Sequence, residues 1–258
     1  DDSRGGKETI MKDTLSPTSD DIDISGPTTN GSHISLEEGL EKVGSYGAYQ
    51  KGNLAINLMI WISGATITMG IPFMEITPEF LCYDDNASQF FECSEKQACN
   101  SNNFMIKEPA PQDVITEFEL YCDRKYLVST IATVFFFGFM VGAYVLSNIS
   151  DRIGRLRTLS GITLATIALS AVGCLAWNIW VFLMVMGVFG FLIAGGTLVS
   201  FVHSAEYLGN AKRHVAAVYL TCGFGIQQIL IAVVSYYTSQ WRYLFLLTLA
   251  SALVYLAL

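Results

Sequence analysis

The sequence predicts an all-α membrane protein with six transmembrane helices. Hydrophobic residues make up 52% of the 258 residues and charged residues only 15%, which is too apolar for an ordinary soluble domain. The chain also contains six apolar runs, and each has about the 17–25 residues that cross a bilayer as an α-helix. These runs lie at residues 54–73, 127–146, 159–176, 180–201, 215–237 and 242–258.

Charged residues cluster outside the apolar runs. The formal net charge is -8, but the acidic residues are concentrated in residues 1–50 and 75–125. From Tyr126 onward there are two acidic residues and six basic ones. This distribution contains no basic stripe of the kind that binds nucleic acid, so we expect no nucleic-acid partner.

The segment before the first run is polar. Residues 1–35 are rich in Asp, Ser, Thr, Gly and Pro and hold almost no large apolar side chains, so we predict a disordered cytoplasmic tail. Ser35 followed by Glu38 forms a capping-box pattern, which predicts a short surface helix before the first span. Residues 36–258 then form the six-span unit.

The loop between the first two runs, residues 75–125, is unusually long and polar. It holds four of the six cysteines and a glycosylation sequon that begins at Asn86. An even number of cysteines beside a sequon predicts an external, oxidising location with two disulfides and a glycan. Three pairings are possible. A zinc site is the alternative, but the loop has no histidine and no C-x-x-C spacing, so we expect no metal. The cysteines are Cys82, Cys93, Cys99 and Cys122.

Polar side chains in or beside the runs are candidates for a substrate cavity. An amide in hydrocarbon needs a partner, and the alternative for Asn57 is a hydrogen bond that joins two helices. Adjacent glutamines point about 100° apart, so we expect one of the pair at 227–228 to face a cavity. A histidine at 203 could sense pH, although an ordinary hydrogen-bonded role is more common. The candidates are Asn57, His203, Tyr219, Gln227 and Gln228.

A charged segment, residues 147–157, separates the second and third runs. It contains the string D-R-x-G-R at Asp151, Arg152, Gly154 and Arg155, and we predict a short hinge at a membrane face. The string resembles the loop between the second and third transmembrane helices of the major facilitator superfamily, although Ser147 stands where that pattern has glycine. The alternative is that the arginines only hold the loop in the cytoplasm.

Further strings resemble the organic cation, anion and carnitine transporter family of that superfamily. They lie at residues 43–50, at 114–125 closing on a Cys-Asp, at 206–213, and at the Trp-Arg pair 241–242. The resemblance covers about residues 36–258. It implies a cytoplasmic charge network that gates transport, and the alternative is a set of independently solvated charges. The network would comprise Asp151, Arg152, Gly154, Arg155, Glu206 and Arg213.

The resemblance implies one half of a major facilitator fold with a cysteine-bearing external loop. Because the chain begins without Met and ends with its last apolar run, we expect the N-terminal half of a twelve-span secondary transporter in the plasma membrane. It would carry small organic ions, whether cation, anion or a zwitterion such as carnitine, by alternating access. Its partners would be the substrate, the bilayer, and either a C-terminal six-helix half or a second copy. The alternative is an accessory or structural six-span subunit without transport.

Sidedness follows from the basic residues. With the N-terminus in the cytoplasm, the 75–125 loop is external and five of the six basic residues after Tyr126 are cytoplasmic, as the positive-inside rule expects. The sequence has no G-x-S-x-G, P-loop or H-E-x-x-H string, so we expect no enzymatic activity and no cofactor.

Overall fold

A computed structural model describes residues 47–84, 89–100, 103–108, 112–238 and 240–257. All of them belong to one unit, Leu36–Leu258. The predicted tail, the capping box at Ser35 and the sequon at Asn86 lie outside the described residues.

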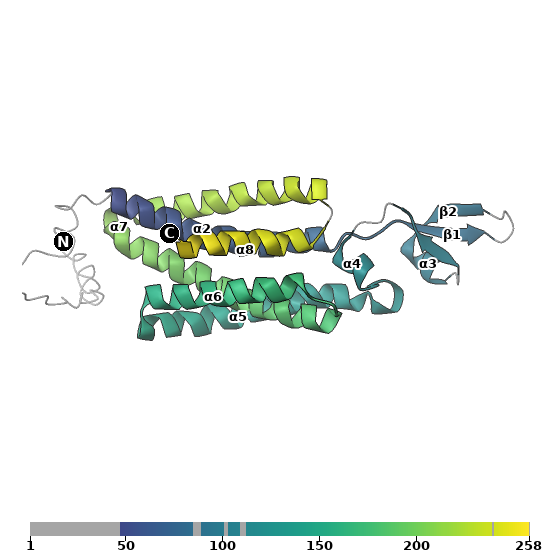
Figure 1. The fold of residues 1–258 in the computed structure, drawn as a ribbon, viewed down its shortest axis with the longest axis horizontal. Helices are drawn as coiled ribbons and strands as arrows, with labels where there is room; N and C mark the ends of the chain where they lie inside the picture. Colours follow the sequence, from purple (N-terminus) through teal and green to yellow (C-terminus); the bar gives the residue numbers. More distant parts are fainter. Residues whose placement is uncertain (1–46, 85–88, 101–102, 109–111, 239, 258) are drawn as a thin grey trace, which may run out of the picture. The chain divides into compact units, whose positions relative to one another are not determined.

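Long helices make up most of the described residues, and a small sheet lies between the first two of them in sequence (Figure 1). The long helices are α2 (Ala48–Met74), α5 (Tyr126–Ile153), α6 (Arg155–Cys174), α7 (Ile179–Thr238) and α8 (Arg242–Ala257). The segment between α2 and α5 contains β1 (Phe80–Asp84), β2 (Gln89–Cys93), α3 (Glu95–Asn100), β3 (Phe104–Ile106), α4 (Val114–Glu117) and a 3-10 turn at Cys122–Arg124.

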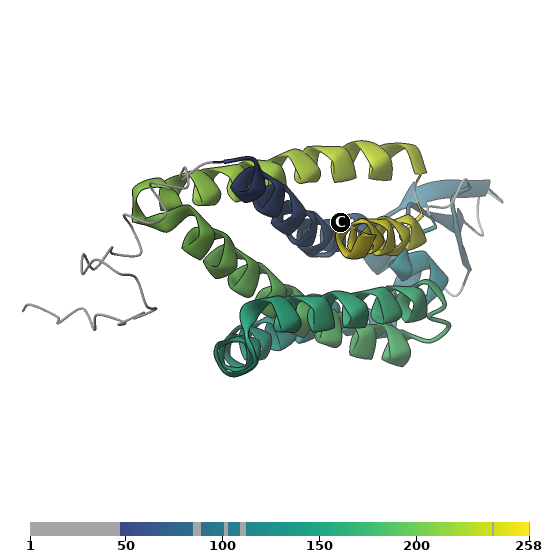
Figure 2. The same cartoon turned by 60° about the vertical axis from the view of Figure 1, so that its left-hand side comes forward.

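Helix α7 is sharply bent, so that its two legs run in opposite directions (Figures 1 and 2). We call Ile179–Leu208 the first leg and Arg213–Thr238 the second leg. The spans predicted at 180–201 and 215–237 lie on separate legs. Including these legs, five described helical segments are long and apolar enough to cross a membrane. The sixth predicted span corresponds to α8, an apolar helix of 16 residues.

The corner between α5 and α6 is much tighter than the hinge predicted at 147–157. Helix α5 continues through Asp151 to Ile153, and α6 begins at Arg155. Only Gly154 interrupts the two helices, with φ at 100°. A side chain is strongly disfavoured at that φ, so glycine makes this one-residue corner possible. We call this end of the helices the corner end, and the opposite end, beside residues 75–125, the loop end.

The core is closest packed where α5 crosses the first leg of α7. A Cβ on Gly142 would lie 2.0 Å from the carbonyl oxygen of Phe191, and a Cβ on Gly190 would lie 2.0 Å from that of Phe135. The two backbones therefore touch directly, as small residues allow in membrane helices. Fully buried aromatic rings fill the core towards the loop end; they belong to Phe135, Phe182, Phe189 and Phe245.

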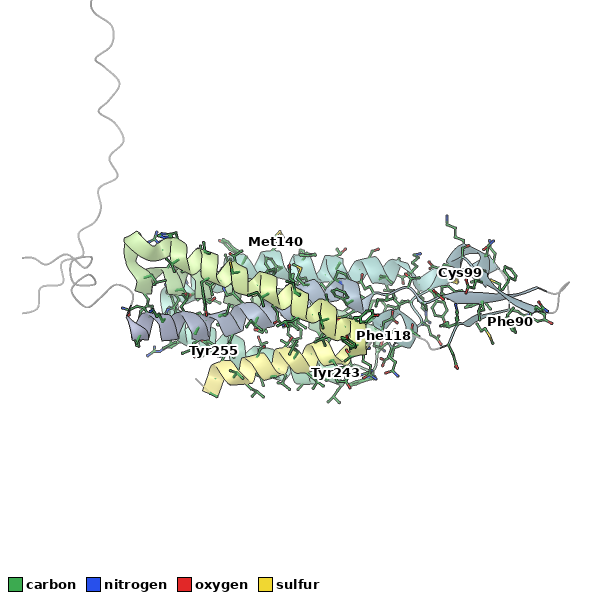
Figure 3. All side chains as sticks on the ribbon, turned by 90° about the horizontal axis from the view of Figure 1, so that it is seen from above. Phe90, Cys99, Phe118, Met140, Tyr243 and Tyr255 are labelled. Carbon is green, nitrogen blue, oxygen red and sulfur yellow. A yellow bond between two sulfur atoms is a disulfide. The ribbon has the colours of Figure 1, made fainter. Side chains whose placement is uncertain are left out.

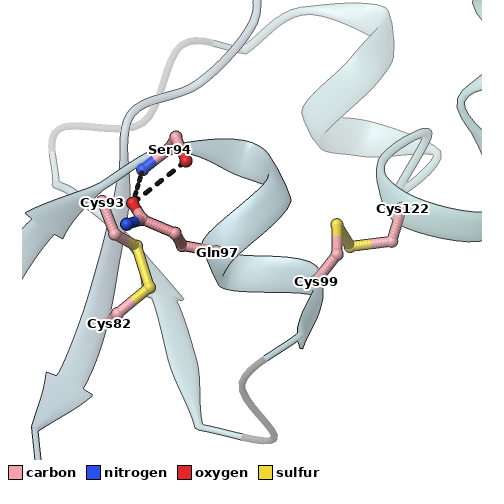
Figure 4. Close-up of a disulfide and its surroundings, with 6 residues drawn as sticks. All are labelled: Cys82, Cys93, Ser94, Gln97, Cys99 and Cys122. Atoms are coloured by element: carbon pink, nitrogen blue, oxygen red, sulfur yellow. Dashed lines mark hydrogen bonds between the residues drawn. A yellow bond between two sulfur atoms is a disulfide. The ribbon is translucent and has the colours of Figure 1, made fainter.

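The 75–125 segment folds as a small disulfide-linked unit (Figure 4). Its sheet is antiparallel with the order β2-β1-β3. The disulfide Cys82–Cys93 links β1 to β2, and Cys99–Cys122 links α3 to the 3-10 turn that precedes α5. The expectation of two disulfides is therefore met, and the structure selects one of the three possible pairings.

Aromatic rings and one carboxylate fasten this segment to the loop end of the helices, where Phe118 lies (Figure 3). The Phe118 ring packs against Trp241 at 6.3 Å and Phe182 at 6.0 Å between centroids. The Glu117 carboxylate accepts two guanidinium hydrogen bonds from Arg242 and one from Trp241 Nε1 at 2.8 Å. We call Glu117, Trp241 and Arg242 the loop-end clasp.

Candidate gating cluster and helix interface

One arginine at the corner end contacts two carboxylates from different helices. Arg155, the first residue of α6, places a guanidinium nitrogen 2.7 Å from Glu206 Oε1 and 3.8 Å from Asp151 Oδ1. Glu206 lies near the end of the first leg of α7, and Asp151 in the last turn of α5. The Arg155–Glu206 pair therefore connects α6 to α7 at the point where the chain turns.

The solvent exposure of these side chains limits the strength of the ion pairs that Arg155 makes with Glu206 and Asp151. The Glu206 side chain is 50% exposed, the Asp151 side chain 66%, and the Arg155 side chain 26%. Water screens ion pairs at such positions, and each contributes on the order of 0.2–1 kcal/mol. A bond of this size holds two helix ends together but can be broken by small changes in their surroundings.

The structure brings together three of the six residues of the predicted charge network, namely Asp151, Arg155 and Glu206. Gly154 contributes through its backbone, by making the corner from which Arg155 projects. Arg152 and Arg213 are exposed, and the described part of the chain gives neither of them a carboxylate within ion-pair distance.

Two tyrosines adjoin the cluster, together with a histidine that we predicted as a cavity residue. His203 is only 6% exposed, and its ring centroid lies 4.8 Å from that of Tyr207. Tyr207 in turn packs against Tyr49 of α2 at 6.1 Å. The sequence interpretation did not single out either tyrosine, although the i,i+4 spacing of His203 and Tyr207 on a predicted helix was a usable signal.

A second group of polar residues ties α2 to both legs of α7. Gln227 on the second leg is buried and donates from Nε2 to Thr66 Oγ1 on α2 at 3.0 Å. Trp61 on α2 donates from Nε1 to Ser200 Oγ on the first leg at 2.9 Å. We call Trp61, Thr66, Ser200 and Gln227 the polar seam. Three of these four residues were not candidates, because sequence spacing does not show which helix faces meet.

The remaining cavity candidates lie apart from these contacts. Asn57 is buried, but its Nδ2 donates to Asn53 Oδ1 at 2.6 Å, one turn earlier on the same helix. That bond lies within α2 and does not join two helices. Gln228 is half-buried and Tyr219 is 39% exposed, both on the second leg.

A small cavity lies inside the bundle between α2, α6, the first leg of α7 and α8. Its volume is about 20 Å³, enough for about one water molecule. Four residues with hydroxyl groups line it, and three of them, Ser63, Thr163 and Thr166, each donate to a carbonyl of their own helix; the fourth is Tyr255. None of the five predicted cavity residues lines it, and its size excludes an organic substrate.

Comparisons with known proteins place the chain in a family. The sequence model described as the Major Facilitator Superfamily matches residues 116–258. The chain is 24% identical to "Organic cation/carnitine transporter 4" of Arabidopsis thaliana over 247 residues, which are 95% of the chain and 46% of that relative. It is 24% identical to "Organic cation transporter 1" of Caenorhabditis elegans over 241 residues, with 80% of the chain and 41% of the relative covered.

A third relative has higher identity over a shorter stretch. "Solute carrier family 22 member 7" of Rattus norvegicus is 32% identical over 133 residues, which are 52% of the chain and 25% of the relative. The chain thus spans less than half the length of the curated relatives named here. These similarities confirm the resemblance found in the sequence. The chain belongs to the major facilitator superfamily.

Proposed function

We propose that this chain is part of a secondary transporter that moves small organic ions across a membrane by alternating access. The observation that carries the proposal is the Arg155–Glu206 ion pair, which links α6 to the first leg of α7 in a superfamily member. The names of the relatives support organic ions as substrates. Because the polar seam is uncharged, it favours no substrate charge, and the proposal includes cations, anions and zwitterions such as carnitine.

The mechanism follows from where the ion pair lies. While Arg155 holds Glu206, the ends of α6 and the first leg of α7 stay together and the corner end is closed. Separation of these ends breaks the pair and opens that side to the substrate. An exposed ion pair of at most about 1 kcal/mol suits this use, because substrate binding can shift an equilibrium of that size.

We further propose that α2, α5, α6, the two legs of α7 and α8 are six spans of one transporter half. The first three and the last three would be two inverted three-helix repeats, as in other members of the superfamily. The substrate path would lie between this half and a second six-helix half, supplied either by a C-terminal segment or by another copy.

The exposed aromatic side chains support a transmembrane placement. Exposed tyrosines and tryptophans lie towards both ends of the helices, as expected for side chains that favour the two boundaries between lipid and water. Those towards the loop end are Tyr126, Trp177, Trp180, Tyr236, Tyr237 and Tyr243, and those towards the corner end are Tyr49, Tyr144, Tyr207 and Tyr219. Arg152, Arg155, Arg157 and Arg213 lie towards the corner end. By the positive-inside rule, we propose that the corner end and the N-terminus are cytoplasmic and that the 75–125 loop is external, in the plasma membrane.

Uptake into cells or proteoliposomes tests the proposal. The probes would be a labelled quaternary ammonium ion, an aromatic carboxylate and carnitine. We expect uptake of at least one probe, with more than tenfold loss in Arg155→Gln and in Glu206→Gln at unchanged surface expression. Arg157→Gln is the matched control, because Arg157 is exposed and lies outside the cluster. Normal uptake by both cluster variants would exclude the gate, and no uptake by a well-expressed protein would favour the accessory-subunit alternative.

A further inference from the structure

A buried histidine lies beside the Arg155–Glu206 pair without taking part in it. His203 is three residues before Glu206 on the first leg of α7, so the two side chains lie on the same helix face. The ring is 6% exposed. The imidazole is therefore largely shielded from water, close to the ion pair that Glu206 makes with Arg155.

The groups that interact with this ring come from α6 and the first leg of α7, and residues of α2 and α5 contact those groups in turn. Arg155 at the start of α6 lies close enough to interact electrostatically with the imidazole. Tyr207 on the same leg contacts the ring edge to face, and Tyr49 of α2 packs behind Tyr207. Asp151 of α5 and Glu206 are the two carboxylates of the cluster, and both are within 4 Å of Arg155.

We propose that His203 is a proton-binding site that controls the Arg155–Glu206 ion pair. A proton on the ring places a second positive charge beside Arg155, and like charges repel. The same proton offers Glu206 an opposite charge one turn away on its own helix, where i,i+3 pairs are neighbours. Both effects weaken the bond between α6 and α7, so the neutral ring permits the closed corner and the charged ring opens it.

The ligand of this site is a proton, and the opening follows the acidity on the corner side of the membrane. Histidine suits this task because its ordinary pKa of about 6.5 lies within the range that cell compartments reach. Protonation of His203 would weaken the Arg155–Glu206 ion pair whether or not the protein transports a substrate. Only the effect of this protonation on uptake rests on the proposed function.

Hydrogen exchange on the whole protein in lipid nanodiscs tests the proposal without any substrate. The readout is exchange at the backbone amides of residues 150–158, corrected for the intrinsic pH dependence of exchange. We expect corrected exchange to be about threefold or more faster at about pH 5.5 than at about pH 7.5, because protonation weakens the ion pair. His203→Asn should abolish this difference, and His214→Asn should retain it, because His214 is exposed at the start of the second leg. An unchanged pH response in His203→Asn would overturn the proposal.

A direct titration covers the case in which His203→Asn does not fold. The chain has three histidines, so the ¹⁵N chemical shifts of labelled histidine can be assigned with His33→Asn and His214→Asn, which leave the remaining signal to His203. We expect the His203 signal to change with pH together with the exchange of residues 150–158. If the ring keeps one protonation state while the corner opens and closes, the proposal is wrong.

Uptake at two cytoplasmic pH values separates this proposal from the proposed function. If a probe is taken up but hydrogen exchange at residues 150–158 does not change with pH, the proton site is rejected and the proposed transport function stands. If hydrogen exchange at residues 150–158 changes with pH through His203 but no probe is taken up, the proposed transport function is rejected and the proton site stands.

Discussion

A Cβ on Gly138 would lie 2.0 Å from the carbonyl oxygen of Gly187, so α5 and the first leg of α7 are in backbone contact at this point. Gly142 and Gly190 repeat the contact one turn away. These two helices carry the two carboxylates that contact Arg155, namely Asp151 and Glu206. The glycine crossing therefore holds both acceptors of Arg155 on one closely packed pair of helices.

Adding a methyl group at this crossing should separate the two helices. We expect Gly142→Ala to lower the thermal midpoint strongly or to prevent folding, because overpacking a core contact costs about 1–3 kcal/mol. Size-exclusion chromatography of detergent-solubilised protein after heating measures this. Gly161→Ala is the matched control, because a Cβ there meets open space and alanine favours a helix by about 1 kcal/mol over glycine. Equal thermal midpoints of Gly142→Ala and Gly161→Ala would contradict a backbone contact between α5 and the first leg of α7 at Gly142.

The corner residue should respond differently from the crossing glycines. A Cβ on Gly154 meets no atom within 4 Å, so Gly154→Ala introduces no clash. Its φ of 100° is nevertheless unfavourable for alanine, at a cost of about 1–3 kcal/mol. We expect Gly154→Ala to fold but to expose the corner, seen as faster hydrogen exchange at residues 150–158 and normal exchange in α8. Unchanged exchange at the corner would show that the backbone there tolerates a side chain.

The loop-end clasp should be sensitive to acid. Burial opposes a charge on Glu117, but hydrogen bonds from Arg242 and Trp241 outweigh it and hold the pKa of this carboxyl below its ordinary value. The stabilisation is therefore complete above the ordinary pKa of Glu and is lost as pH falls through the lowered one. We expect Arg242→Gln to increase hydrogen exchange at residues 112–121 at neutral pH.

The surface pair of Lys107 provides the control for the clasp. Lys107 binds Glu79 and Glu92 at exposed positions, so Lys107→Gln should leave exchange at residues 112–121 unchanged. If Lys107→Gln increases hydrogen exchange at residues 112–121 as much as Arg242→Gln does, the loop-end clasp does not specifically stabilise this segment.

Glu75 should destabilise the fold at alkaline pH. Burial raises the pKa of Glu75 from its ordinary value of 4.5 to about 7, and its Oε1 has no hydrogen-bond partner among the described residues. The folded state then retains a proton that the unfolded chain has lost, so stability falls as pH rises from about 4.5 to about 7. We expect Glu75→Gln to raise the thermal midpoint at about pH 8 but not at about pH 5, measured by differential scanning fluorimetry. Glu79→Gln, at an exposed carboxyl, should show no such difference.

Apolar runs predicted the helices well, since desolvation alone determines which segments suit a membrane. Each of the six runs lies on a described helix or leg, apart from residues 175 and 176, which follow α6, and residue 258. The connections were harder to predict. Charges at 147–157 suggested a hinge, but helical hydrogen bonding continues to Ile153 and only the positive φ of Gly154 ends it. The runs predicted at 180–201 and 215–237 are separate in the sequence pattern, but the chain between them bends within one continuous helix.

Pairwise contacts depend on helix rotation, which the sequence patterns did not reveal. Gln227 and Thr66 are 161 residues apart, and nothing in their spacing shows that they face each other. The cysteine pairing was likewise open, because it depends on a sheet order that was not predicted. The Arg155–Glu206 contact was anticipated because family strings marked both residues.

The order of the chain allows both disulfides to form before the later helices are synthesised. All four bonded cysteines precede Tyr126, so both bridges can close while the chain that forms α6, α7 and α8 is still on the ribosome. Glu117 and Arg242 are 125 residues apart, so Glu117 is synthesised well before the arginine that binds it. The disulfide-linked segment can therefore be complete before Arg242, at the start of α8, binds Glu117.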